Sequence, residues 1–180
     1  MMALRKIKLS PGAALLIALC IILDESSFAL MLLMAVIIHE LGHLLFLKIF
    51  RYEIMQLSLS AFGLEIDYRG CLEGVEGLIS IAAGPIFGLV YGLGSQMAGK
   101  EFWRMSGGIS LALSMFNLIP VLPLDGGRML LIIAGERGRD ISRGISLVLF
   151  AAAAILSITK GWISLLLMGS WLLVYNLRKT

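Results

Sequence analysis

An apolar run from Ala29 to Leu47 carries one polar cluster, and this combination limits what the chain can fold into. The residues on both sides of the cluster are apolar, so no face of a helix here would be polar. A helix that is hydrophobic all round lies in a large core or in a membrane. The chain is 59% hydrophobic and 15% charged, with a mean hydropathy of +0.94. A soluble chain of 180 residues has too little interior for so much apolar surface. We therefore expect an integral membrane protein.

The polar cluster is His39-Glu40-Leu41-Gly42-His43, an H-E-x-x-H pattern. Positions i and i+4 share one face of a helix, so both imidazoles can reach one metal ion. The Glu between them can take a proton from a water molecule at that metal. These are the only 2 histidines in the chain. The alternative is a pair of core histidines without a metal, which is costly to bury in an apolar helix.

The apolar runs predict an all-α polytopic membrane protein with about six transmembrane helices. A short helix at Arg128–Ala134 and a charged loop at Gly135–Arg143 are expected between the fourth and fifth. We expect one membrane-embedded domain over residues 1–180, with a core at 26–135, helices 5 and 6 at 144–177, and no PDZ or CBS domain. The expected spans are about Leu9–Leu23, Ser26–Phe50, a stretch within Gly77–Gly99, Trp103–Ile119, Gly144–Thr159 and Gly161–Leu177.

Between the second and third spans, Glu53–Tyr68 alternates apolar and polar residues. This period of two predicts a short β-hairpin at the membrane edge, with a turn at residues 62–63. The alternative is an irregular loop.

The basic residues indicate how the spans are oriented. With six spans and the N-terminus inside, the 15 Lys and Arg residues divide 12 to 3 in favour of the inner side. Basic residues accumulate on the cytoplasmic side of membrane proteins. We therefore expect both termini and the hairpin to be cytoplasmic. The net charge of +3 comes from this loop bias, and no basic-aromatic pattern points to a nucleic-acid partner.

A catalytic zinc site needs a third protein ligand and one open position. The third ligand must be a carboxylate, because no third histidine exists. Asp125 stands out among the acidic residues, since it follows the fourth span directly in a Pro/Gly-rich turn, Pro120-Val121-Leu122-Pro123-Leu124-Asp125-Gly126-Gly127. The alternative is an Asp that only caps a helix.

Three motifs in this order resemble the site-2 protease (M50) family of intramembrane zinc metalloproteases. They are HELGH, Ala83-Gly84-Pro85 in the third span, and NLIPVLPLDGGR, which begins at Asn117. Because the sequence has no PDZ insertion, it resembles the smaller branch of the family, near bacterial stage IV sporulation protein FB. One departure is Gly88, which stands where the family pattern Gly-Pro-x-x-Asn has Asn.

The resemblance implies that His39, His43 and Asp125 hold one Zn²⁺, that Glu40 is the base, and that Asn117 stabilises the oxyanion. The substrate would be a membrane-anchored protein cleaved in or near its transmembrane segment, as in regulated intramembrane proteolysis. The enzyme would lie in the lipid bilayer of the bacterial cytoplasmic membrane, with a regulatory membrane partner or a homo-oligomer as further partners.

A helical substrate must unwind before cleavage, and an extended segment can add to a strand edge. We expect that edge near Leu57, Leu59 and Ala61. A competing hypothesis is a zinc-binding membrane scaffold or metal carrier without catalysis. Carriers place polar ligands along a path through the spans, whereas here the candidates form one cluster and Glu40 is left over as a base.

Overall fold

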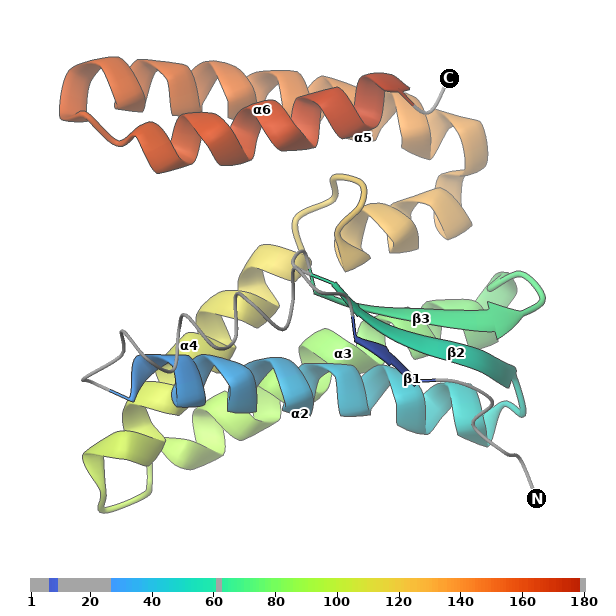
Figure 1. Cartoon of the computed structure of the whole chain (residues 1–180). Coiled ribbons are helices and arrows are strands. Elements are labelled where there is room, and N and C mark those ends of the chain that lie inside the picture. Colours follow the sequence, from blue (N-terminus) through green and yellow to red (C-terminus); the bar gives the residue numbers. More distant parts are fainter. Residues whose placement is uncertain (1–6, 10–26, 61–62, 179–180) are drawn as a thin grey trace. The chain divides into compact units, whose positions relative to one another are not determined.

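The chain folds mostly into helices, with one small β-sheet (Figure 1). The structure, a computed structural model, describes residues 7–9, 27–60 and 63–178. The predicted first span lies outside these residues except for Leu9, which ends a strand. The elements are β1 (Ile7–Leu9), α2 (Phe28–Ile49), β2 (Glu53–Ser60), β3 (Gly63–Arg69), α3 (Gly74–Ser95), α4 (Glu101–Asn117), α5 (Asp125–Lys160) and α6 (Ile163–Arg178).

Three of the described helices are long and apolar enough to cross a membrane. These are α2, α3 and α5, and α6 is a shorter apolar helix. The predicted second, third, fourth and sixth spans each coincide with an observed helix to within a few residues. The membrane class is supported by these helices, while the count of six spans stays a prediction.

The chain forms two compact units. One comprises Met1–Leu72 and Ala83–Ser114, and the other comprises Glu73–Ala82 and Met115–Thr180. The first therefore holds the sheet, α2 and most of α3 and α4. The second holds the turn after α4, together with α5 and α6, which run side by side (Figure 1).

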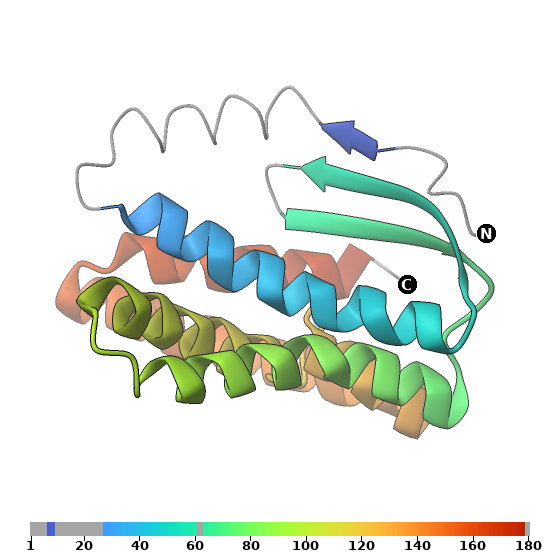
Figure 2. The same cartoon turned by 90° about the horizontal axis from the view of Figure 1, so that it is seen from below.

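The predicted hairpin is confirmed: β2 and β3 pair antiparallel, with Glu53 opposite Arg69 and Ser60 opposite Gly63. The sheet has a third strand, because β1 pairs parallel to β2 (Figure 2). The order β1-β2-β3 makes β2 the central strand.

The central position of β2 corrects one expectation. We expected the backbone near Leu57–Ala61 to offer a free edge to a substrate strand. Leu57, Ser58 and Leu59 instead lie between the partner residues Ile7–Leu9 of β1 and those of β3. A substrate role for the side chains of Leu57, Leu59 and Ala61 stays a prediction.

The charged loop predicted at Gly135–Arg143 is wrong, because residues 136–143 are helical within α5. The helix is broken only at Gly135, whose φ of 55° and ψ of −133° are not helical. Figure 1 shows the chain turning there between two helical stretches. The charges pair along the helix surface: Glu136 with Arg139 at 3.4 Å, and Asp140 with Arg143 at 3.4 Å. Opposite charges three residues apart support a helix, so a dense charge run did not mark a loop here.

Small residues let α3 and α4 approach closely in the first unit. They recur every fourth residue, at Gly88 and Gly92 on α3 and at Ser106, Ser110 and Ser114 on α4. The Ser110 hydroxyl donates to the Gly88 carbonyl at 2.9 Å. A Cβ atom added at Gly88 would collide with the Ser114 hydroxyl. Membrane helices that pack through small residues bring their backbones together in this way.

Candidate metal site

One face of α2 is buried and carries both histidines. His39 and His43 are 4% and 9% exposed, and Ala35 and Leu47 continue the same face. Ile37, Leu41 and Leu45 point the other way and are exposed. The helix thus presents apolar side chains outward, as a lipid-facing helix does, and turns its imidazoles inward.

The two imidazoles face each other with their Nε2 atoms. The Nε2 atoms of His39 and His43 lie 3.2 Å apart. The ring centroids are 4.9 Å apart and the ring planes are inclined by 77°. Two nitrogens bound at 2.0–2.1 Å to one tetrahedral zinc ion lie about 3.3 Å apart. The pair therefore fits two ligands of one zinc ion.

Two glycines bring α2 and α3 close enough to fix this pair. A Cβ atom on Gly42 would lie 2.5 Å from the Ala83 carbonyl oxygen of α3. A Cβ atom on Gly84 would collide with the His43 ring. The Ala-Gly-Pro motif therefore lies against the His43 imidazole, and its glycine is the residue that leaves room for the ring.

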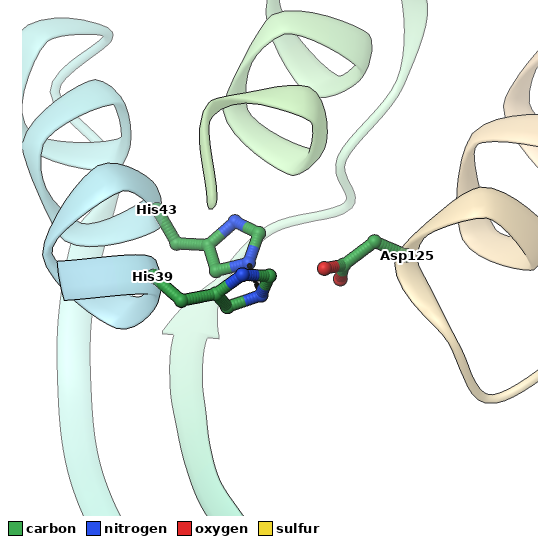
Figure 3. Close-up of side chains that lie close together, drawn as sticks. All are labelled: His39, His43 and Asp125. Carbon is green, nitrogen blue, oxygen red and sulfur yellow. Dashed lines mark hydrogen bonds between the residues drawn. The ribbon is translucent and has the colours of Figure 1, made fainter. Parts of the chain in front are cut away.

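Asp125 is buried in the second unit, at 6% exposure, and is the first residue of α5. The N-cap position belongs to Leu124, so Asp125 does not take the capping position of the alternative interpretation. A carboxylate in the first turn of a helix is stabilised by the helix dipole. The Arg128 guanidinium lies 3.9 Å from the Asp125 carboxylate. Figure 3 draws Asp125 with the two histidines.

The Pro/Gly-rich turn before Asp125 is packed tightly within the second unit. Val121, Leu124 and Leu172 form its buried apolar cluster. Cβ atoms at Gly126 and Gly127 would collide with the backbone of the turn at Leu118 and Leu122. The two glycines after Asp125 therefore let the start of α5 lie directly on the preceding turn.

The other predicted site residues take separate positions. Glu40 is half-buried and follows His39 in α2, and Asn117 is half-buried and ends α4. Leu57 is half-buried in β2, and Ala61 lies outside the described residues. The structure thus brings His39 and His43 together in one unit, and places Asp125 and Asn117 in the other.

Two residues that bond to the turn before Asp125 were missed by the sequence analysis. Ser142 and Asn176 are buried in α5 and α6 and hydrogen-bond to the backbone at Leu122. The available signal was a lone amide, Asn176, in the apolar stretch of α6. An amide in such a helix is expensive to bury without partners.

Comparisons with known proteins agree with one another. The sequence profile of peptidase family M50 matches residues 71–159, a stretch that includes Asn117 and Asp125. A presumed zinc metalloprotease from Synechocystis sp. is 34% identical over 128 residues, covering 65% of this chain and 34% of that protein. Stage IV sporulation protein FB from Bacillus subtilis is 26% identical over 176 residues, covering 93% of this chain and 58% of that protein. The chain therefore spans only part of the length of both relatives.

Among solved structures, the site-2 protease from Methanocaldococcus jannaschii has a similar fold. The TM-score is 0.71 at 23% sequence identity, with 99% of this chain and 93% of that chain covered. At this sequence identity the likeness concerns the fold.

Proposed function

This chain belongs to the site-2 protease family, peptidase family M50, and from this premise we propose that it cleaves membrane-anchored proteins in or near a transmembrane segment. The proposed class, a zinc metalloprotease, is supported by the family and by the name of one relative. The substrate class and a role in regulated intramembrane proteolysis are our proposal. The observation that carries it is the pair of Nε2 atoms, 3.2 Å apart on the buried face of an apolar helix.

We propose His39, His43 and Asp125 as the zinc ligands. Each of the three side chains is buried and offers a ring nitrogen or a carboxylate oxygen to a metal ion (Figure 3). Two imidazoles and one carboxylate are a donor set typical of catalytic zinc, which keeps a fourth position open. When bound, zinc would acidify a water molecule and polarise the peptide carbonyl of the substrate.

The remaining chemistry belongs to the protein. The Glu40 carboxylate, next to a ligand in the H-E-x-x-H pattern, would accept the proton of the attacking water and return it to the leaving amine. The Asn117 amide would donate a hydrogen bond to the oxygen that becomes negatively charged. Exposed apolar side chains on α2, such as Leu41 and Leu45, suit contact with lipid or with a transmembrane substrate.

The test combines metal analysis with cleavage. Purified wild-type protein should hold one zinc ion per chain, and His43→Ala and Asp125→Ala should lose it. Glu40→Gln should keep its zinc and lose at least ~10²-fold in the cleavage of single-span membrane proteins reconstituted in liposomes.

Two results would contradict the proposal. Undiminished zinc in His43→Ala would remove the ligand assignment. Equal cleavage by zinc-loaded Glu40→Gln would remove the general base, and no cleavage by wild type across a broad substrate panel would favour the scaffold or carrier hypothesis.

A further inference from the structure

A closed ring of hydrogen bonds surrounds the Leu122 backbone in the second unit. The Leu122 amide donates to the Ser142 hydroxyl at 2.8 Å, and this hydroxyl donates to Asn176 Oδ1 at 2.7 Å. Asn176 Nδ2 donates to the Leu122 carbonyl at 2.7 Å and to the Leu172 carbonyl at 2.8 Å. Both backbone groups of Leu122 are therefore bonded to side chains from α5 and α6.

The ring joins two buried polar side chains of α5 and α6 to the turn, and not only to each other. Ser142 is 0% exposed and Asn176 is 3% exposed. Buried polar side chains destabilise a fold unless they are hydrogen-bonded, and here they bond to each other and to a turn from a distant part of the chain. Fully satisfied buried networks hold their members rigidly.

The Leu122 backbone also supports the first turn of α5. A Cβ atom at Gly127 would collide with the Leu122 amide nitrogen, so this stretch of α5 lies directly on it. The Leu124 amide donates to the Val121 carbonyl at 2.9 Å, which closes the turn just before Asp125. A displacement of Leu122 would therefore move the Asp125 backbone.

We propose that Ser142 and Asn176 are positioning residues for the carboxylate of Asp125. They hold the turn through Leu122 and so set the place from which Asp125 reaches the metal. This inference rests on the proposed function, in which Asp125 is a zinc ligand. Residues that orient metal ligands typically contribute 10–100-fold to metal affinity.

The experiment compares Ser142→Ala with Ser146→Ala in the full-length protein. Ser146 is the matched control, because it is equally buried on α5 and its hydroxyl donates within its own helix, to the Arg143 carbonyl at 2.8 Å. Asn176→Asp is a second variant, which keeps the shape but removes the two amide donors. Zinc affinity is measured by chelator competition, the ligand geometry by the absorption spectrum of the Co²⁺-loaded protein, and backbone protection by hydrogen exchange of the metal-free protein.

We expect Ser142→Ala and Asn176→Asp to weaken zinc binding by about 10–100-fold and to change the cobalt spectrum. Exchange should become faster near Leu122 and stay unchanged along the rest of α5 and α6. Ser146→Ala should match wild type in all three measurements.

Three outcomes would overturn the inference. Wild-type zinc affinity in Ser142→Ala, with zinc lost in Asp125→Ala, would refute positioning while leaving the proposed function intact. Faster exchange throughout α5 and α6 would show a general loss of stability instead. Zinc retained in Asp125→Ala would refute the ligand assignment itself, and the positioning role with it.

Discussion

Substituting Gly84 by Ala should disturb the metal site through His43 while leaving every proposed ligand in the sequence. The added Cβ atom would lie within 2.7 Å of three atoms of the His43 ring, whereas ordinary contacts are 3.4–4 Å. The ring or the helix must therefore move by roughly 1 Å, while metal–ligand distances tolerate only about 0.2 Å. We expect zinc affinity and activity to fall by about 10–100-fold, as for other changes that misplace a ligand.

The assay is chelator competition for zinc, together with cleavage, on purified Gly84→Ala. Gly94→Ala is the matched control, because Gly94 lies in the same helix and an added Cβ there has nothing within 4 Å. Replacing Gly by Ala inside a helix is by itself favourable, by about 1 kcal/mol. The control should therefore bind zinc as wild type does. Wild-type zinc affinity in Gly84→Ala would refute the view that Gly84 leaves room for the ring.

Two further predictions concern topology and helix packing. Reporter fusions at Thr180 and near Lys100 should report cytoplasmic and external positions, as the bias of basic residues indicates; an external signal at Thr180 would contradict the six-span topology. Gly88→Asn, which completes the Gly-Pro-x-x-Asn pattern of the sequence analysis, should collide with Ser114 and lower the free energy of unfolding by ~1–3 kcal/mol in thermal denaturation. Gly108→Asn on α4 is its control, since a Cβ there meets nothing within 4 Å, and equal stability of the two variants would count against a tight α3–α4 contact.

Sequence patterns predicted the parts of the fold that depend on neighbouring residues, namely the histidine face of α2 and the hairpin of β2 and β3. The H-E-x-x-H spacing placed His39 and His43 on one face of a helix, and the period of two predicted β2 and β3, because both depend on neighbours in the sequence. The strand β1 could not be found in this way. It has only three residues, and its partner strand begins at Glu53.

The residues that hold the turn before Asp125 could not be predicted from a sequence pattern either. Ser142 and Asn176 are single polar residues in different helices, and each makes sense only when the turn at Leu122 lies between them. The prediction of a loop at Gly135–Arg143 failed for a related reason. Charge density indicates solvent exposure, but Glu136 and Asp140 are exposed on a helix, where their spacing to Arg139 and Arg143 forms ion pairs.

Three glycines of the sequence motifs, Gly42, Gly84 and Gly126, have the same physical role in the structure. Gly42 lets α2 approach Ala83, Gly84 leaves room for the His43 ring, and Gly126 lets α5 lie on the turn at Leu118. Gly42 and Gly126 are next to proposed ligands in the sequence, and Gly84 lies against the ring of one. Glycine has no side chain, so none of the three can itself bind the metal through one. The ligands are thus placed by removing Cβ atoms around them, because a backbone or a ring occupies the space that a side chain would fill. A substitution at one of these glycines should therefore move a metal ligand, whereas one at an open glycine such as Gly94 should leave the ligands in place.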